Sequence, residues 1–400
     1  MNLYTRTVVV ALCIVPFLNP EHSAPLATFH TEAIAFGLGL ALILRFYAYR
    51  DTLEAPLIVV GLFSASGLVL VQEVLGFIST PRALAGAAVF AWAAYLVHAG
   101  AEEQHRDAGT VDTLQAALAA GGFLAAVAGI IQHYGLSTIF GGFNILYPSP
   151  ENGMVGTLAQ RNLFANYVSL GIISTGVLFV RSRLTLTTAI LMLAPMAGAV
   201  ALSGSRSSIV FLGIFAAAIC WLRAERGYLI GAITFSILAV VTLSPLVGTV
   251  QTGIERIIGD SPGSWHRAYL FEHAWALFIQ VPFIGAGFGE FEKYLPSIGP
   301  MDTNAHNLAL HLGAELGALG ALLIIGPLVY HAAKFKWKGA HSPSVAWAVA
   351  CLAVQFAHSA VEFPLWNVNF LGVTCLIMGS LLVPNCPRSS ARLSTPSKPS

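Results

Sequence analysis

The sequence predicts an all-α polytopic integral membrane protein with about twelve transmembrane helices and one large loop outside the membrane. Of its 400 residues, 56% are hydrophobic and 10% are charged, whereas a soluble domain carries roughly 25% charged residues. The mean hydropathy of the chain is +0.74. Long apolar stretches of this kind cross a bilayer as helices, because a helix satisfies its own backbone hydrogen bonds.

The apolar residues fall into segments close to the ~20 residues that a helix needs to cross ~30 Å of hydrocarbon. The first segment and the pair around Arg183 are short, so the count holds to within one or two. The predicted spans are 5–19, 26–45, 56–77, 82–100, 112–132, 162–181, 184–202, 206–222, 227–246, 304–330, 344–361 and 364–384.

These spans divide the chain into four regions. Residues 1–246 hold nine spans and a long loop at 133–161, residues 247–303 form the large outer loop, and residues 304–384 hold three spans. The tail at 385–400 is rich in Pro and Ser and is expected to be disordered.

The distribution of Lys and Arg predicts the orientation. Positive residues favour cytoplasmic loops, and most of the 20 Lys and Arg share one side when both termini are cytoplasmic. The exceptions lie near span ends on the outer side, where they do not serve orientation, and are therefore candidates for chemistry. They are Arg82, Arg161, Arg206, Arg256, Arg267 and Lys293.

The sequence lacks the motifs that are typical of several classes of function. No basic cluster indicates a nucleic-acid partner. The five cysteines show no CxxC spacing, and no HExxH, DxD or carboxylate-rich pattern indicates a metal site. No GxSxG motif is present. The GAGFGEF run at 285–291 lacks the strand–turn–helix setting of a nucleotide loop and is predicted to be a turn. We therefore expect neither metal nor other cofactor.

The stretch DTNAHNLALHLGAELG at 302–317 carries the strongest candidate site. On a helix, His311 and Glu315 are four residues apart and share a face, whereas His306 lies about 140° away from His311. Titratable residues beside a membrane are costly and are usually functional. We take His306, His311 and Glu315 as catalytic candidates; the alternative is a polar helix start whose histidines only cap and hydrogen-bond.

Two arginines at predicted helix starts indicate anion binding. GTLAQRN at 156–162 puts Arg161 where the helix macrodipole favours a negative charge, and ALSGSRSSIVFLG at 201–213 does the same with Arg206. A bound phosphate resolves this conflict, because Arg161, Gln160, Asn162 and free backbone N–H groups can hold it together. The alternative is an arginine that extends to lipid headgroups.

Three further segments on the outer side carry polar groups. Residues 265–280 have the aromatic spacing of an interfacial helix and include Arg267. His358 and Glu362 are four residues apart before Pro364, which ends their helix, and His22 lies in the first outer turn; these three are candidate supports. Arginines on this side can bind phosphates, and histidines can accept protons. Together they predict a metal-independent group transfer from a lipid-linked phosphate donor.

Five stretches resemble the O-antigen ligase and polymerase superfamily of bacterial inner membranes, and within it most closely the O-linked oligosaccharyltransferases that glycosylate pilins. They are NPEHSAPLATFHTE at 19–32, GTLAQRNLFANY at 156–167, GSRSS at 204–208, the segment from Arg267 through HNLALHLGAELG at 306–317, and HSAVEFPLWNVNFLG at 358–372.

The resemblance implies a glycosyltransferase of the GT-C-like kind, with its active face in the periplasm. It implies an undecaprenyl-pyrophosphate-linked glycan as donor and a hydroxyl of a periplasmic protein, such as a pilin Ser or Thr, as acceptor. It assigns deprotonation of the acceptor to His306, with His311 as the rival, and binding of the pyrophosphate to Arg161, Arg206 and Arg267.

Other readings stay open at this point. Many protein-glycosylating members carry a soluble region after the last span, where this chain has a short tail, so the acceptor could instead be the lipid A core. A polysaccharide polymerase of the same superfamily uses a second lipid-linked glycan. A lipid or polysaccharide transporter would need polar residues near the middle of its spans, whereas here they cluster at one face.

Overall fold

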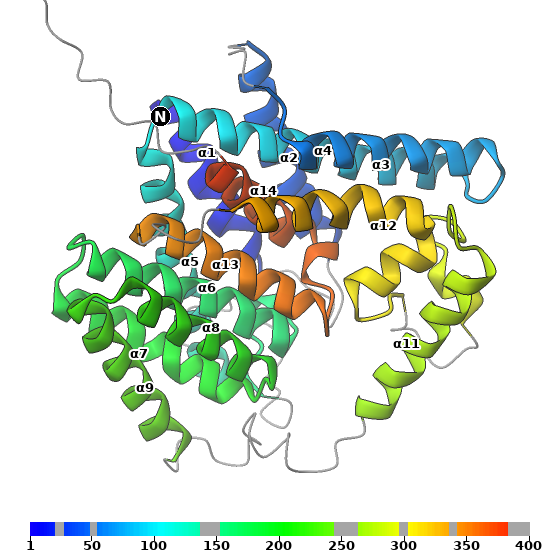
Figure 1. The fold of residues 1–400 in the computed structure, drawn as a ribbon. Helices are drawn as coiled ribbons and strands as arrows, with labels where there is room; N and C mark the ends of the chain where they lie inside the picture. The colour runs from blue at the N-terminus through cyan, green and yellow to red at the C-terminus, as the bar shows by residue number, and fades with distance from the viewer. Residues whose placement is uncertain are drawn as a thin grey trace, which may run out of the picture.

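The computed structural model describes residues 1–20, 28–48, 54–136, 153–243, 263–295, 303–335 and 342–382, and every regular element within them is helical (Figure 1). His22, Arg256 and the tail at 385–400 lie outside these described residues.

Every predicted span contains a helix, and a further helix covers the segment at 265–280, whose interfacial position stays a prediction. The helices are α1 Leu3–Ile14, α2 Phe29–Ala48, α3 Leu57–Val74, α4 Thr80–Arg106, α5 Gly109–His133, α6 Arg161–Val180, α7 Leu186–Ser203, α8 Ser207–Leu222, α9 Glu225–Thr242, α11 Gly263–Gln280, α12 Leu308–Lys334, α13 Pro343–Ser359 and α14 Val368–Leu382.

Within the described ranges, seven helices are long and apolar enough to cross a membrane, namely α3, α4, α5, α6, α7, α9 and α12. The structure is therefore consistent with a polytopic membrane protein. The number of twelve spans and the outer position of the large loop stay predictions.

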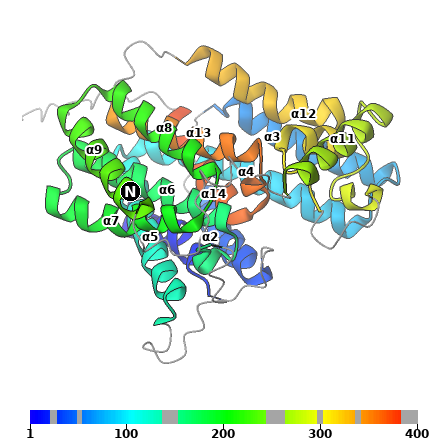
Figure 2. The same cartoon turned by 90° about the horizontal axis from the view of Figure 1, so that it is seen from below.

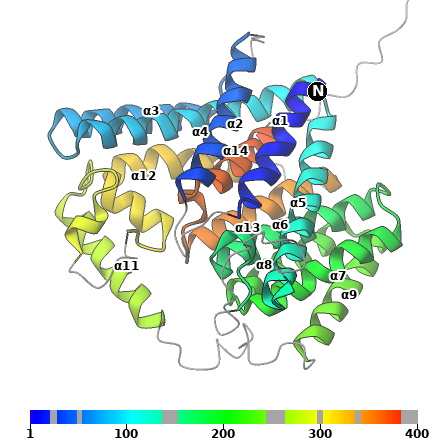
Figure 3. The same cartoon turned by 180° about the vertical axis from the view of Figure 1, so that it is seen from behind.

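Helix α6 lies at the centre of one group of helices. It packs against α5, α7, α8 and α13, and nearly all of its side chains are buried (Figure 2). Small residues permit this close packing: a Cβ on Gly122 of α5 would lie 2.7 Å from the Cα of Gly171 in α6. Membrane helices commonly approach each other through such residues. Seen from behind, α1 lies beside α2 and α5 (Figure 3).

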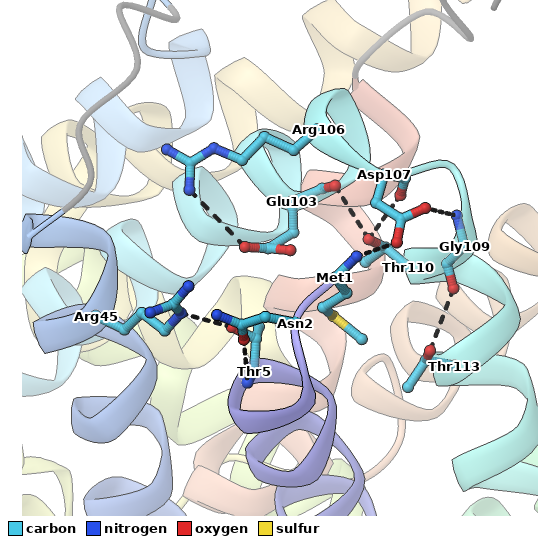
Figure 4. A network of polar contacts seen from close by, with 10 residues as sticks. All are labelled: Met1, Asn2, Thr5, Arg45, Glu103, Arg106, Asp107, Gly109, Thr110 and Thr113. Atoms are coloured by element: carbon cyan, nitrogen blue, oxygen red, sulfur yellow. Dashed lines mark hydrogen bonds and ion pairs between the residues drawn. The ribbon is translucent and has the colours of Figure 1, made fainter.

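Polar contacts gather at the two ends of the bundle. At the end that the charge bias assigns to the cytoplasm, Arg45 Nε donates to Thr5 Oγ1 (2.9 Å) and Thr110 Oγ1 donates to the carbonyl of Glu103 (3.1 Å) (Figure 4). These contacts tie the start of α1 to the end of α2, and the end of α4 to the start of α5.

At the opposite end, the predicted outer turns contact one another. Thr157 Oγ1 donates to the carbonyl of Phe17 (2.6 Å), and the N–H of Val368 donates to Glu32 Oε2 (2.8 Å). Arg82 pairs with Glu290 at 2.5 Å. Turns that the sequence assigned to the outer side thus lie together at one end of the bundle, and the side of the membrane that this end faces stays a prediction.

Helix α12 is interrupted, although the sequence predicted one continuous span over 304–330. Gly317 adopts φ 68° and ψ −172° inside the helix. The N–H groups of Ala318 and Leu319 donate to the carbonyls of Pro282 (2.7 Å) and Phe283 (3.1 Å). The preceding loop therefore replaces helical hydrogen bonds, and it can do so because glycine adopts a positive φ without steric cost.

Replacing Gly317 with Ala is expected to destabilise the protein by about 1–3 kcal/mol, because a residue with a Cβ is strained at the positive φ that this position requires. That Cβ would lie 2.4 Å from the carbonyl carbon of Phe283. Thermal unfolding of the purified protein in detergent measures the change. Gly313→Ala is the matched control, since its Cβ would lie 3.4 Å from the Phe278 ring, an ordinary contact. Equal melting temperatures for the two variants would contradict the expectation.

Candidate functional site

The carboxylate of Glu362 is the meeting point of three segments. It is 2% exposed and lies in the turn after α13. Its Oε1 accepts a hydrogen bond from Asn162 Nδ2 of α6 (2.7 Å) and forms an ion pair with Arg267 of α11. Its Oε2 lies 3.0 Å from His306 Nδ1, just before α12. One buried carboxylate thus brings together residues that are far apart in the sequence.

The local sequence directs Glu362 to this position. Helix α13 ends at Ser359, and the N–H of Glu362 still donates to the carbonyl of His358 (2.8 Å). Pro364 then begins a short 3-10 helix over Pro364–Trp366. Because the residue before a proline avoids helical conformation, the chain leaves the helix here, as the sequence predicted.

Asn162 extends the network to α8. Its Oδ1 accepts a hydrogen bond from Ser205 Oγ (2.8 Å), so both ends of its amide are engaged. Gln160 caps α6, because its Oε1 accepts from the N–H of Leu163 (2.6 Å). The predicted pyrophosphate-binding residues Gln160 and Asn162 therefore serve the helix start and the Glu362 network.

The predicted anion-binding arginines flank this network. Arg161 is the first residue of α6, and Arg206 directly precedes α8. Each is next in sequence to a member of the network, Asn162 and Ser205 respectively, and both arginines are partly buried. Their helix-start positions agree with the sequence analysis, and their role in pyrophosphate binding stays a prediction.

Glu362 is held in its ionised form. Burial by itself raises the pKa of Glu362, but the hydrogen bond with His306 and the positive charges of His306 and Arg267 outweigh this, and the pKa lies below its usual value. An ionised carboxylate only accepts hydrogen bonds. We therefore assign the proton of the contact to His306 Nδ1, which leaves Nε2 as the basic nitrogen of the ring when it is neutral.

The backbone and an aromatic ring fix His306. Its φ is +48°, a conformation that is uncommon for residues other than glycine. Its N–H donates to Asn304 Oδ1 (3.0 Å), and the edge of its ring meets Phe363, with centroids 5.1 Å apart. Unusual backbone conformations of this kind concentrate at functional sites.

His311 lies beside His306 but is less exposed to solvent. Its Nδ1 accepts the N–H of Ala305 (3.3 Å), and its ring centroid lies 4.4 Å from that of Trp366. Its side chain is 3% exposed, against 17% for His306. Both histidines line one small cleft together with Glu362, Phe363 and Trp366.

Glu315 lies against a loop and does not line this cleft. As the sequence predicted, it shares a helix face with His311, whose Nε2 lies 3.5 Å from Glu315 Oε2. However, its two oxygens accept the N–H groups of Gly289 (2.9 Å) and Phe291 (3.1 Å). The helix spacing alone gave no sign of the loop that contacts Glu315, and a catalytic role of Glu315 stays a prediction.

His358 is also separate from the cleft. Its Nδ1 lies 2.7 Å from Asn166 Nδ2, and Gln355 Nε2 donates to Asn166 Oδ1 (3.0 Å). The sequence analysis placed His358 beside Glu362 as a support between the last two spans, whereas the structure shows it joining α13 to α6. Asn166 and Gln355 escaped the sequence analysis, although buried amides in apolar helices are a signal of such a network.

Gln72 is a further residue that the sequence analysis missed. It is fully buried in α3. Its Nε2 donates to the carbonyl of Glu315 (2.7 Å), and its Oε1 accepts the N–H of Phe288 (3.0 Å). It therefore holds the glycine-rich loop against α12. Among the described residues, no group of three or more His, Cys, Asp or Glu side chains has the arrangement of a metal site.

Comparison with known families gives one match. Residues 190–325 match the sequence model of a family described as O-antigen ligase. A search of curated proteins found no significant match. The matched region runs from α7 through most of α12 and includes Arg206, Arg267, His306, His311 and Glu315. It supports the O-antigen ligase superfamily and indicates an integral membrane enzyme for glycosyl transfer of the ligase or polymerase type.

The ion pair of Glu362 is expected to make stability depend on pH. The pKa of Glu362 is lowered by folding, so the stabilisation is complete above the ordinary pKa of a glutamate and is lost as the pH falls through the folded value. Wild-type protein should therefore lose melting temperature relative to Glu362→Gln as the pH falls below about 4. Thermal unfolding at a series of pH values tests this, and parallel curves for the two proteins would contradict it.

Proposed function

We propose that this protein transfers a glycan from undecaprenyl pyrophosphate to an acceptor hydroxyl at the outer face of the bacterial inner membrane. The observation that carries the proposal is the contact of His306 with a buried, ionised Glu362 at the edge of a cleft, where Glu362 is also paired with Arg267. The match of residues 190–325 to the O-antigen ligase family supports the same chemistry.

The reaction is a displacement at the anomeric carbon of the glycan. The acceptor oxygen forms a bond to that carbon while the bond from the carbon to the pyrophosphate oxygen breaks, and the leaving pyrophosphate keeps the bonding electrons. The proton of the acceptor hydroxyl passes to His306 Nε2. The negative charge of Glu362 at Nδ1 stabilises the imidazolium that forms, as a buried carboxylate does for a catalytic histidine.

His306 is better placed than His311 to act as the base. Its side chain is more exposed to the cleft, and a carboxylate orients its ring. His311 has its Nδ1 engaged by a backbone N–H and packs against Trp366. We assign His311 to shaping the cleft, and Glu315 to positioning the loop behind it.

Arg267 serves the leaving group while it stays paired with Glu362. A guanidinium carries five N–H donors, so one contact with a carboxylate leaves others for phosphate oxygens. Arg161 and Arg206 lie next to members of the same network and supply further positive charge. Cations aimed at the leaving pyrophosphate stabilise the charge that develops on it.

The charge bias, together with the two sets of end contacts, supports an orientation in the membrane. The cleft lies at the end where the predicted outer turns meet, and the positive-charge bias assigns the other end and both termini to the cytoplasm. The active face is then periplasmic. We propose a protein acceptor, such as a Ser or Thr of a pilin, because the GTLAQRN and VEFPL stretches resemble the protein-glycosylating members. Lipid A core and a growing polysaccharide are the competing acceptors.

Transfer by the purified protein tests the proposal. The assay supplies an undecaprenyl-pyrophosphate glycan with a pilin, lipid A core or no added acceptor, each with and without EDTA. We expect product on the pilin and no effect of EDTA. Product on lipid A core alone would identify a ligase, and lengthened lipid-linked chains alone would identify a polymerase. The absence of transfer to every acceptor would contradict the proposal.

His306→Ala is expected to reduce kcat by about 10²–10⁴-fold, the usual contribution of a positioned general base. The same substitution at His331, which lies in the opposite half of α12, is the matched control and should retain activity. A donor-binding measurement separates loss of chemistry from loss of substrate affinity, and full activity of His306→Ala would remove the proposed base.

A further inference from the structure

An apolar cavity lies beside the cleft, between α3, α4, α12 and α14. It has a volume of about 180 Å³, and its walls include Leu62, Phe90, Leu312, Leu371 and Met378. Its lining is apolar apart from Thr374 and Cys375. An apolar cavity of this volume accepts part of a hydrocarbon chain and offers few hydrogen bonds to a sugar.

The cavity and the polar cleft share a wall. Leu308, Leu365 and Trp366 line both of them. The Trp366 ring packs against His311 on the cleft side and against Phe288, with ring centroids 5.8 Å apart in the latter pair. The charged group of Glu362 and its partners therefore lies at one end of an apolar chamber, which is the arrangement that binds an amphiphile.

Close helix contacts seal two sides of the cavity. A Cβ on Gly61 would lie 2.1 Å from the carbonyl oxygen of Leu323, so α3 touches α12 directly. A Cβ on Gly379 would lie 2.0 Å from the carbonyl oxygen of Val97, so α14 touches α4. No side chain larger than that of glycine fits at either contact without a shift of the helices.

On the side of the cavity between α12 and α13, the two helices make few contacts with each other. Helix α12 packs along α3 and α11, whereas α13 packs along α6, α8 and α14 (Figure 2). Across the described residues, α12 scarcely contacts α13 or α14. The side between α12 and α13 is therefore the one on which the helix backbones are not in close contact.

The adjacency of cleft and cavity fits the donor better than the acceptor. In a lipid-linked donor the phosphate is joined directly to the hydrocarbon, so the cationic site and the apolar chamber must touch. In a glycolipid acceptor, sugars separate the attacking hydroxyl from the lipid, and a protein acceptor brings no chain at all. Leu365 and Trp366 follow Glu362 by only a few residues, as the donor requires.

We propose that this cavity binds the hydrocarbon chain of the lipid-linked donor, which enters between α12 and α13 and places its phosphate end against Trp366 and Leu365. The inference rests on the proposed function for the identity of the donor. It adds the residues that hold the lipid and the side from which the lipid enters.

Filling the cavity tests this proposal. Ala93 of α4 is 1% exposed and lines the cavity. Ala93→Phe should raise the KM for a long-chain polyprenyl donor about tenfold, because it displaces chain atoms that each contribute through burial. The KM for a water-soluble farnesyl-pyrophosphate glycan, whose short chain leaves the deep part of the cavity empty, should change little. Transfer to one fixed acceptor provides the readout.

Ala321→Phe is the matched control. It makes the same change on α12 but lines the groove between α11 and α12 instead of the cavity. It should leave the KM for both donors unaltered. Equal effects of the two variants on the long-chain donor, or equal KM values of the wild type for both donors, would overturn the proposal.

A second measurement does not depend on a stable variant. A wild-type sample is irradiated with a long-chain donor that carries a photoreactive group several prenyl units from the phosphate. Labelled peptides should come from α4 and α14, and labels confined to the outer groove of α11 and α12 would contradict the assignment. Wild-type protein that transfers from neither donor would instead count against the proposed function, so the two failures are distinguishable.

Discussion

A buried carboxylate needs partners, and this requirement organises the outer end of the molecule. Removing a glutamate from water costs several kcal/mol unless charges and hydrogen bonds compensate it. Glu362 obtains that compensation from Arg267, Asn162 and His306, which come from α11, α6 and the segment before α12. The chain must therefore close around this group, and the closure leaves the histidine ring oriented at the edge of the cleft.

A second network supports the first from behind. Gly289, Phe291 and Gln72 hold the two ends of Glu315, its carboxylate and its carbonyl, so the loop over 285–291 and α12 form one unit. His311 stands between the two networks and packs against Trp366. Both histidines face one cleft, although an ideal helix would put them about 140° apart, because His306 precedes α12 and has a φ of +48°.

The sequence allowed the helices to be predicted, because length and apolar composition decide which segments cross a bilayer. It also located Arg161 and Arg206 at helix starts. It did not pair His306 with Glu362, which lies 56 positions away, because contacts at such separations depend on the packing of whole helices. The predicted spacing of Glu315 from His311 was correct, but its main partners lie 24 and 26 residues earlier, in a loop that spacing does not reveal.

The interruption at Gly317 has a mechanical consequence. The first part of α12, which carries His311, is fastened by the N–H groups of Ala286 and Gly287, which donate to the carbonyls of Ala314 and Glu315. The remainder begins at the hydrogen bonds of Ala318 and Leu319 and continues toward Lys334. Membrane helices adjust their tilt when bilayer thickness changes. A helix that is broken at this point transmits such tilting poorly, so we expect the spacing of the reacting groups to be insensitive to the lipid composition around the protein.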